Sequence, residues 1–556
     1  MTEDSGAAFL GVERSVTGKR WRARLTDDRS ALALAQQFDR AVTRIVAAIN
    51  AGETIGILGD YDVDGATSSA LLVRFFAALG RAAPVYIPDR QLEGYGPNLP
   101  ALMKLKEAGA SLVITVDCGT TAYDPLEAAV DAGLEIVVID HHVAEPRLPA
   151  GCIVVNPNRA DEKSSCGNLA AVGVCFLLVV ALNRALREAY WYDEGHPEPD
   201  LMGLLDLVAL GTVCDVVPLN GVNRALVTQG LQIMARRGNP GIAALADVAG
   251  VDRRLEAYHA GFVLGPRVNA GGRVGDSGLG VRLLTTSDPD EARAVAQRLD
   301  DYNRERQEIE QGVQEAALDQ AEKQASGNRP LILVSGEGWH PGVIGIVAGR
   351  LRERFDRPAC VVALENGLGK GSGRSVPGVA LGPAVIAAHQ AGILVNGGGH
   401  AMAAGFTVEQ ERLDDLRDYL ATHIERQLDG EVLAPSLGFD GVLSPLAATP
   451  ELIATLEKAG PFGAGNSRPR FAIPQARVVD SGVVGKGHVR CILTGADGTG
   501  RLKAIAFRSA DTALGQALLN ARGTPLHIAG NLRADEWRGV TSAQLFIDDA
   551  ALCGAA

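Results

Sequence analysis

TIGILGDYDVDG, residues 54–65, contains both a predicted strand and a group of acidic residues. Its first part, Thr54–Leu58, is short and continuously apolar, which is typical of a strand buried on both faces of a parallel sheet. Its second part places Asp60, Asp62 and Asp64 at alternate positions, so their side chains point the same way if the strand geometry continues. Three crowded carboxylates repel one another unless a cation is present. This stretch therefore predicts a metal site where a strand ends.

The alternation of strands and helices extends on both sides of this stretch. A helix is predicted over residues 30–51, before it. Further apolar, strand-like runs cover residues 85–87, 112–116 and 136–139, and helix-like stretches separate them. The pattern predicts an α/β domain whose parallel sheet is covered on both faces. Such sheets bind ligands at the carboxyl ends of their strands.

Candidate metal ligands also follow the later strands. One strand ends in VDCG, residues 116–119, and another in IDHH, residues 139–142, while GTVCDVVP, residues 211–218, places an aspartate after an apolar helix. A single aspartate after a strand is more often a helix cap than a ligand, but several such ends in one sheet are hard to explain as caps. Oxygen ligands mixed with imidazole suit Mn²⁺ or Mg²⁺ better than a thiolate zinc site does. Two such ions that share a carboxylate would activate water and stabilise charge on a phosphoryl group.

The motifs DYDVDG, VDCG, DHH and GTVCDVVPL resemble, in this order, the four motifs of the DHH phosphoesterase superfamily. The resemblance extends over roughly half of the chain, with IPDRQLEGYG and GPRVNAGGRVGD between and after the motifs. One departure concerns the first motif, because many relatives carry a histidine four positions before Asp62, where this chain has Leu58. Asp60 is therefore a further candidate, either as a ligand or as a residue that orients a water.

This resemblance implies roles for the individual residues of the site. One ion would be held by Asp62 and Asp117, and His142 would face the scissile phosphate. The second ion would be held by Asp64, Asp117, His141 and Asp215. The predicted catalytic residues are thus Asp62, Asp64, Asp117, His141, His142 and Asp215. The candidate metal ligands are Asp60, Asp62, Asp64, Asp117, His141 and Asp215.

A long polar stretch precedes a second α/β unit. It begins at Ser287, runs to about Gln324 and predicts a connecting helix. Strand-like runs at 331–334 and 359–363 follow, with glycine-rich turns expected near Lys370 and Gly397. Clustered glycines let backbone N–H groups approach a phosphate.

The glycine clusters HPGVIG, GSGRS and GGGH resemble the substrate domain associated with the DHH superfamily. The resemblance implies that residues of these clusters hold the strand end or the leaving nucleotide. An exposed Tyr95 could stack on a base, and GPRVNAGGRVGD could add polar contacts from the first domain. The predicted substrate ligands are Tyr95, Arg267, Asn269, Arg273, His340, Arg374, Ser375 and His400.

After Gly430 the pattern changes to five short β-like runs, at residues 470–473, 489–493, 502–507, 526–532 and 543–547. Five such runs predict a small β-barrel of the OB-fold type. The chain has a net charge of −13, but residues 467–556 contain 11 Lys and Arg against 7 Asp and Glu. The last part is therefore basic, and it mixes cations with aromatic residues as single-strand grooves do. The residues concerned are Arg490, Arg501, Lys503, Phe507, Trp537, Arg538 and Phe546.

These features predict four segments: a DHH catalytic domain with an N-terminal arm (1–286), a connecting helix (287–328), a DHH-associated domain (329–430) and an OB-fold (431–556). If the OB-fold only holds the strand, truncation after residue 430 should leave the metal centre untouched.

The resemblance is greatest to the branch of exonucleases that degrade single-stranded DNA. It implies two Mn²⁺ or Mg²⁺ ions, 5′ to 3′ hydrolysis to mononucleotides, and a role in DNA repair and recombination. An oligoribonuclease or a cyclic-dinucleotide phosphodiesterase is the alternative, but those enzymes resemble only the first two units. A catalytically silent scaffold, a third alternative, would have lost metal ligands that this chain retains.

Several features bear on surroundings and partners. The longest apolar run, Leu169–Leu182, is shorter than the roughly 20 residues that cross a bilayer. The eight cysteines contain no CxxC pair, which favours reduced thiols. We therefore expect a cytoplasmic protein without membrane contact. Single-stranded DNA is the expected partner, and a single-strand DNA-binding protein and a RecQ-type helicase are further candidates.

Overall fold

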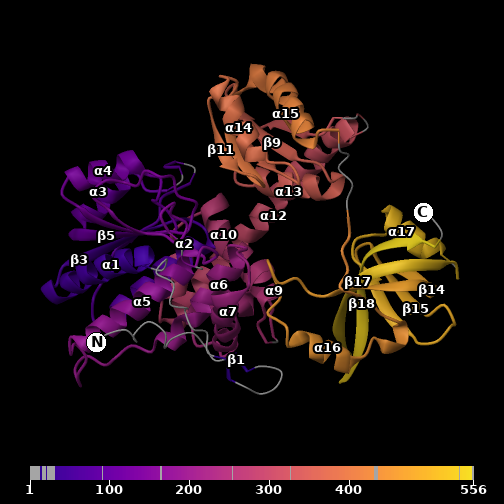
Figure 1. The fold of residues 1–556 in the computed structure, drawn as a ribbon, viewed down its shortest axis with the longest axis horizontal. Helices are drawn as coiled ribbons and strands as arrows, with labels where there is room; N and C mark the ends of the chain where they lie inside the picture. Colours follow the sequence, from indigo (N-terminus) through magenta and orange to yellow (C-terminus); the bar gives the residue numbers. More distant parts are fainter. Residues whose placement is uncertain are drawn as a thin grey trace.

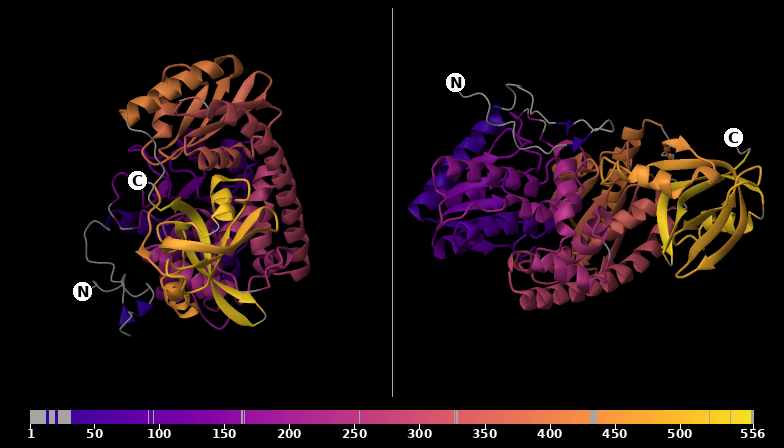
Figure 2. Two further views of the ribbon diagram at one scale, coloured as in Figure 1. Left: turned by 90° about the vertical axis from the view of Figure 1, so that its right-hand side faces the viewer. Right: turned by 90° about the horizontal axis from the view of Figure 1, so that it is seen from below.

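The structure, which is a computed structural model, consists of three domains (Figure 1). It describes residues 13–14, 20–21 and 32–553, except 91, 95, 163, 165, 253, 326, 328, 431–435, 522 and 538. An α/β domain, a second α/β domain and a β-barrel follow one another along the chain. The views of Figure 2 place the barrel at one end of the molecule. Within the described part, no helix is long and apolar enough to cross a membrane, and all eight cysteines are free.

A parallel sheet forms the centre of the first domain, as predicted, and it has five strands, of which β7 was not among the four predicted ones. The strand order is β4-β3-β5-β6-β7, and each neighbouring pair is parallel. The strands are β3 (Thr54–Gly59), β4 (Val85–Tyr86), β5 (Ala110–Val116), β6 (Glu135–Ile139) and β7 (Ile153–Val155). The central strands are almost completely buried, because helices cover both faces.

The helices of this domain bury one apolar cluster on each face of the sheet. One cluster contains Ile57 and Phe75, and the other contains Leu102 and Val138. The helices are α1 (Leu32–Ala51), α2 (Val63–Ala78), α3 (Leu99–Glu107), α4 (Tyr123–Asp131), α5 (Ala171–Glu188), α6 (Leu205–Cys214), α7 (Gly221–Met234), α8 (Pro240–Val248), α9 (Ala257–His259), the π-helical turn η3 (Ala260–Leu264), α10 (Gly265–Val274) and α11 (Leu279–Thr285).

The acidic stretch after β3 is a turn into a helix, so the expectation of continued strand geometry is wrong. β3 ends at Gly59, and Asp62 is the N-cap of α2, where its side chain accepts the N–H of Gly65 at 3.0 Å. Aspartate is a preferred N-cap residue, and here capping decides the local conformation. A Cβ on Gly65 would lie 2.4 Å from the carbonyl oxygen of Asp60, so the tight turn requires glycine.

The predicted connecting helix is α12 (Pro289–Ala325), which packs on α8 and α10 and then on β8 and α13. The second sheet has the order β11-β12-β10-β9-β8, in which only the β8–β9 pair is parallel. Its elements are β8 (Ile332–Glu337), α13 (Ile344–Phe355), β9 (Ala359–Glu365), β10 (Leu368–Arg374), α14 (Leu381–Gln390), β11 (Asn396–His400), β12 (Ala403–Glu409) and α15 (Leu413–Leu428).

Two glycine-rich stretches of this domain are strands, although turns were expected near Lys370 and Gly397. They form β10 and β11. A Cβ on Gly371 would lie 2.1 Å from the Phe406 ring, and one on Gly397 would lie 2.9 Å from Val385. The neighbouring side chains therefore occupy the space that strand side chains normally fill.

The C-terminal domain is the predicted barrel. Its strands follow the order β13-β14-β15-β16-β18-β17, and a β14–β17 pairing closes it. β13 (Gly441–Val442) is an additional short strand. The five barrel strands are β14 (Arg470–Val484), β15 (His488–Thr494), β16 (Leu502–Ala506), β17 (Pro525–Trp537) and β18 (Val540–Leu552), with helices α16 (Pro450–Glu457) and α17 (Ala513–Asn520) packed against them.

Candidate functional site

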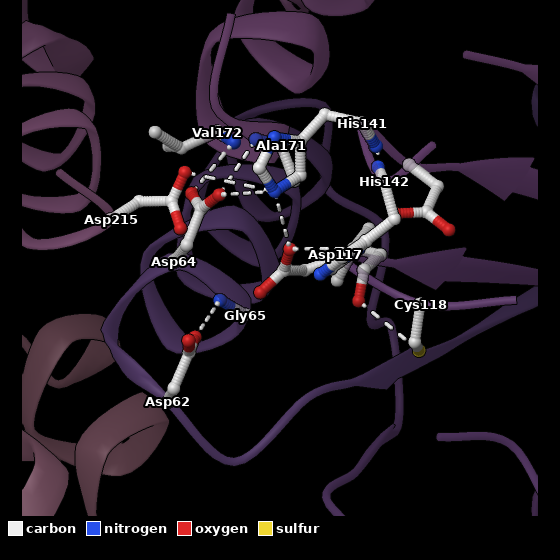
Figure 3. A network of polar contacts seen from close by, with 12 residues as sticks. Asp62, Asp64, Gly65, Asp117, Cys118, His141, His142, Ala171, Val172 and Asp215 are labelled. Carbon is white, nitrogen blue, oxygen red and sulfur yellow. Dashed lines mark hydrogen bonds and ion pairs between the residues drawn. The ribbon is translucent and has the colours of Figure 1, made fainter. Parts of the chain in front are cut away.

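The candidate metal ligands meet at the carboxyl edge of the first sheet (Figure 3). Three groups of side chains have ligand atoms within 4.8 Å of one another. These groups are Asp60, Asp62 and Asp117; Asp64, His141 and Asp215; and Asp117, His141 and His142. The structure thus brings together every residue that the sequence proposes as a metal ligand. Asp117 and His141 each belong to two of the groups, and of these two only the carboxylate of Asp117 offers two oxygens, so Asp117 is the natural bridge between two ions.

The spacing around His141 fits a divalent cation. Its Nε2 lies 3.3 Å from Asp117 Oδ1, 3.6 Å from Asp215 Oδ2 and 3.9 Å from Asp64 Oδ2. An octahedral ion with bonds of about 2.1 Å holds neighbouring ligand atoms roughly 3 Å apart. Nε2 of His141 and Oδ2 of Asp215 are buried, and neither makes a hydrogen bond within the described residues. Buried polar atoms are normally satisfied, so a cation is the missing partner that this donor set fits.

The helix α5 stabilises the most buried carboxylate. Oδ2 of Asp64 accepts the N–H of Ala171 at 2.6 Å, and Oδ1 accepts the N–H of Val172 at 2.9 Å. These two residues begin α5, where unpaired N–H groups and the helix dipole favour an anion. Both oxygens of Asp64 are therefore held in place from α5 while the group faces the other ligands.

Asp117 has an unusual backbone conformation. Its φ of 61° lies in the left-handed region, and its N–H donates to the carbonyl oxygen of Ile139 at 3.0 Å. Such conformations cost about 1–3 kcal/mol and concentrate at functional sites. The turn aims this carboxylate back across the strand ends, towards Asp62 and His141.

Burial and mutual repulsion raise the pKa of four carboxyl groups of the site. Burial first, and then neighbouring carboxylates, raise the pKa of Asp60, Asp64 and Asp117 well above the usual range. Burial and the charge of Asp62 raise the pKa of Asp215 to about 7. A bound cation would therefore displace protons from this site.

We expect the apparent affinity for Mn²⁺ to rise as the pH increases from about 6 to about 8. The carboxyl group of Asp215, whose pKa is about 7 instead of the ordinary 3.8, must lose its proton before it binds. The folded, metal-free chain holds more protons than the unfolded chain in this range, so its stability should fall with rising pH. Calorimetric titration in buffers of different ionisation enthalpy measures both affinity and proton release. A pH-independent affinity without proton release would contradict this assignment.

The two adjacent histidines differ in charge at neutral pH. Burial, followed by the charge of His142, lowers the pKa of His141 to about 4, so His141 is a neutral imidazole at neutral pH. Burial also opposes the charge of His142, but its hydrogen bond with Asp140, at 2.8 Å between Nδ1 and Oδ1, prevails and raises the pKa to about 9. A neutral imidazole suits a metal ligand, and an imidazolium suits a phosphate oxygen.

A basic cavity of about 460 Å³ lies between the two α/β domains, next to these ligands. Arg273 of the first domain donates to the carbonyl oxygen of Gly342 at 2.9 Å and so joins the domains there. Burial first, and then Arg90, lower the pKa of Arg273 to about 10, which keeps the group charged at neutral pH. The polar side chains that line the cavity are Tyr61, Arg90, Arg273, Lys370, Ser372, Arg374, Asn396 and Thr407, among several glycines.

Only some of the predicted substrate ligands reach this cavity. Arg273 and Arg374 line it. Arg267 instead forms an ion pair with Asp300 of α12 at 2.8 Å, so it joins α10 to the connecting helix. Ser375 is 1% exposed and donates to the carbonyl oxygen of Val379 at 2.7 Å, so it stabilises a turn.

The other predicted ligands have different positions. His340 accepts the N–H of Gly342 through Nδ1 at 3.0 Å and so supports a loop that lines the cavity. Asn269 lies in α10 and His400 ends β11, and neither lines the cavity. Tyr95 lies outside the described residues.

Sequence reasoning missed Arg90 and Lys370 as cavity residues. Arg90 lies in IPDRQLEGYG and stacks over the Tyr61 ring, 5.0 Å from its centroid. Tyr61 itself lies between two candidate metal ligands, so the cavity adjoins the metal site. Arg90 could have been predicted from the sequence, because it is an arginine within a motif that resembles the family. No sequence feature indicated Lys370, because the residues around it were expected to form a turn and not a strand.

The cations predicted to line a groove on the barrel are partly paired with carboxylates. Arg490 binds Asp480 at 2.8 Å, and Lys503 binds Asp535 at 2.9 Å. Phe507 is half-exposed and packs edge-on against Phe546, while Arg501 is exposed. Arg538 and the side chain of Trp537 are outside the described part of the chain.

The segment that leads into the barrel, which includes Ala459 and Ala464, contacts the residues that follow the candidate ligand Asp215. The N–H of Leu219 donates to the carbonyl oxygen of Ala464 at 2.7 Å, and Arg224 donates to that of Ala459 at 2.7 Å. Leu219 lies four residues after the candidate ligand Asp215. The expectation that truncation after residue 430 spares the metal centre is therefore not supported, because it would remove these hydrogen bonds.

Comparisons with known proteins agree with this architecture. Three family models match: the DHH family, N-terminal domain, at residues 54–212; the DHHA1 domain at residues 328–426; and the RecJ OB domain at residues 439–549. The single-stranded-DNA-specific exonuclease RecJ of Escherichia coli is 38% identical over 92% of this chain and 89% of that protein. The chain belongs to the RecJ family.

Other RecJ proteins give the same result. The RecJ of Bacillus subtilis is 35% identical over 92% of this chain and 63% of its own length. A crystal structure of RecJ from Thermus thermophilus in complex with Mn²⁺ superposes with a TM-score of 0.76 at 30% identity, covering 93% of this chain and 71% of that one. A further structure, of exonuclease RecJ bound to manganese, has a TM-score of 0.60 at 33% identity and covers 71% of this chain and 97% of that one.

Proposed function

We propose that this RecJ-family chain is a metal-dependent exonuclease that degrades single-stranded DNA from the 5′ end to mononucleotides. The observation that carries the proposal is the adjacency of a carboxylate–histidine centre and an arginine-lined cavity, joined through Tyr61. The first can support phosphodiester hydrolysis, and the second can hold the end of the strand. Digestion of end-labelled single strands of DNA, followed by analysis of the products, tests the proposal directly.

The residues of the centre divide into two ligand sets. Asp60, Asp62 and Asp117 would hold one Mn²⁺ or Mg²⁺ ion. Asp64, His141 and Asp215 would hold the other, together with Asp117, whose Oδ1 lies 3.3 Å from Nε2 of His141. When bound, two such cations supply a water of lowered pKa and offset the charge on the phosphoryl group.

His142 acts on the phosphate in this proposal. Its hydrogen bond with Asp140 keeps the ring protonated and directed, and 42% of its side chain is exposed. A protonated imidazole can donate to a phosphoryl oxygen as negative charge develops there. His141, which is neutral and more deeply buried, stays with the ligands.

The cavity supports an exonuclease over an endonuclease. Arg90, Arg273 and Arg374 line one space, and several glycines line it with them. Guanidinium groups and backbone N–H groups together bind phosphate well. A terminal 5′-phosphate held there would place the first phosphodiester bonds near the metal centre, which gives 5′ to 3′ polarity.

We expect Arg374→Ala to raise KM for 5′-phosphorylated single strands about 10- to 100-fold, because a charge-assisted hydrogen bond contributes about 1.5–3 kcal/mol. Strands with a 5′-hydroxyl should show a much smaller effect. Arg354→Ala is the matched control, since Arg354 is an exposed arginine of the same domain that pairs with Glu322. Equal effects on both kinds of strand end would show that the cavity does not bind the terminal phosphate.

The barrel is proposed to hold the strand beyond the cavity. We expect the double variant Arg490→Ala/Lys503→Ala to weaken binding of long strands and to flatten log Kd against log salt by about 0.7 for each phosphate that is no longer neutralised. Substitutions are used because truncation would disturb the junction at Leu219. Arg412→Ala, which removes a partly exposed cation of the second domain that pairs with Asp415 at 2.7 Å, is the control. An unchanged salt slope in the double variant would assign another role to this face.

The alternative activity on short RNA or cyclic dinucleotides is not favoured, because the RecJ OB domain matches residues 439–549. By family membership, we further propose a cytoplasmic role in DNA repair and recombination. A single-strand DNA-binding protein and a RecQ-type helicase are the proposed protein partners, and co-purification with each of them tests this.

A further inference from the structure

Two asparagines that follow β7 hold the backbone of both site histidines. Nδ2 of Asn156 donates to the carbonyl oxygen of His142 at 2.8 Å, and Nδ2 of Asn158 donates to that of His141. The N–H groups of the same two histidines donate to Oδ1 of Asp140, at 2.8 Å and 3.2 Å. Side chains therefore fix all four main-chain polar groups of the histidine pair.

Asn156 also reaches the loop that carries Asp117. Its Nδ2 donates a second hydrogen bond to Oγ1 of Thr120 at 2.8 Å, and the N–H of Thr120 donates to Oδ2 of Asp140 at 3.0 Å. Its Oδ1 accepts the N–H of Asn158 at 2.7 Å. Asn156 is 0% exposed, and both of its amide hydrogens are used. One buried side chain thus joins the segments that follow β5, β6 and β7.

We propose that Asn156 is a positioning residue for the hydrolytic step and acts through His142. The direction of the His142 ring depends on Asp140, which binds Nδ1 at 2.8 Å. Asn156 donates directly to the backbone carbonyl group of His142. It contacts Asp140 only indirectly, through Thr120. A misplacement of about 1 Å at a reacting group can cost roughly 100-fold in rate. This inference rests on the proposed function and names a further residue of the same site.

Two variants of Thr120 distinguish a positioning role of Asn156 from a role in packing alone. Thr120→Val keeps the shape of the side chain and removes the hydroxyl group that accepts from Asn156. Thr120→Ser keeps the hydroxyl group and removes a buried methyl group. We expect the Val variant to lose about tenfold or more in kcat, with KM for single strands unchanged, and the Ser variant to retain at least about half of the activity. The reverse order would mean that only packing matters and would overturn the proposal.

A double-mutant cycle tests the dependence on His142. We expect Asn156→Ala to lower kcat about 10- to 100-fold in the otherwise unchanged chain. In the His142→Ala background the same change should cost less than about threefold, because residues that act as one unit are not additive. Additive losses would overturn the proposal.

Asn183→Ala provides the matched control. Asn183 is another buried asparagine of the same domain, and it is hydrogen-bonded to Glu198 and Tyr192 instead of to the site. We expect a comparable loss of thermal stability without a change in kcat.

Calorimetric titration with Mn²⁺ gives a second readout. The affinity of the Asn156→Ala variant should stay within about threefold of the parent. A loss of Mn²⁺ affinity as large as the loss of kcat would place Asn156 behind the metal ligands and overturn its assignment to His142. Failure of the proposed function is distinguishable, since the parent chain would then not hydrolyse single strands at all.

Discussion

We expect Asp117→Ala to abolish hydrolysis while the chain remains folded. Asp117 is grouped with Asp60 and Asp62 on one side and lies 3.3 Å from Nε2 of His141 on the other, so its removal takes an oxygen ligand from both proposed ions at once. A loss of several kcal/mol of transition-state stabilisation corresponds to a fall in kcat of more than about 1,000-fold. Single-turnover digestion of a labelled strand at saturating Mn²⁺ measures it, and circular dichroism with thermal unfolding verifies the fold.

Two further variants control for backbone strain and for loss of a buried acid. Asp117→Asn separates ligand loss from strain, because asparagine tolerates the φ of 61° better than alanine does. It should be nearly as inactive as the alanine variant. Asp206→Asn removes another buried carboxylate of the domain, one outside the three ligand groups, and should keep its activity. Turnover of Asp117→Ala at the parent rate would disprove the bridging assignment.

His142→Ala should lower kcat by about 100- to 1,000-fold and leave metal binding largely intact. The reason is that His142 is proposed to donate to the phosphate, and a positioned charged donor or acid contributes about that much. Its Nδ1 is already engaged by Asp140 at 2.8 Å, which leaves the other ring nitrogen for the substrate. Steady-state kinetics and Mn²⁺ titration of the same preparation measure the two effects.

The paired variant His141→Ala supplies the contrast. Nε2 of His141 faces three carboxylate oxygens, so this variant should lose metal affinity as well as activity. If His142→Ala lost the bound metal and His141→Ala kept it, the roles of the two histidines would be reversed.

The sequence predicted the parallel sheet well, because strands buried on both faces are continuous apolar runs. β3, β5 and β6 lie where such runs were found. It also predicted that Asp117 and Asp215 would meet, although almost one hundred residues separate them. That prediction depended on motif resemblance, since spacing alone does not bring α6 to the edge of the sheet.

The remaining misses have two physical causes, which are local helix capping and competition for partners between distant segments. Asp62 caps a helix, so the acidic residues do not continue a strand. Arg267 pairs with Asp300, whereas Arg90 is left to line the cavity. Long side chains can reach several partners, and only the tertiary arrangement determines which one is nearest. The Asn156 hydrogen-bond network was missed for the same reason, because it links three separate strand ends.

The central claim is that a two-metal centre beside a phosphate-binding cavity removes nucleotides from the 5′ end of single-stranded DNA. Digestion of strands labelled at the 5′ or the 3′ end, in parallel with double strands and short RNA, tests it most directly with Mn²⁺ and with Mg²⁺. We predict immediate release of labelled mononucleotide from the 5′-labelled single strand, progressive shortening of the 3′-labelled one, and no product in the presence of a chelator. First release of mononucleotide from the 3′ end, internal cleavage, or equal digestion of double strands would contradict the claim.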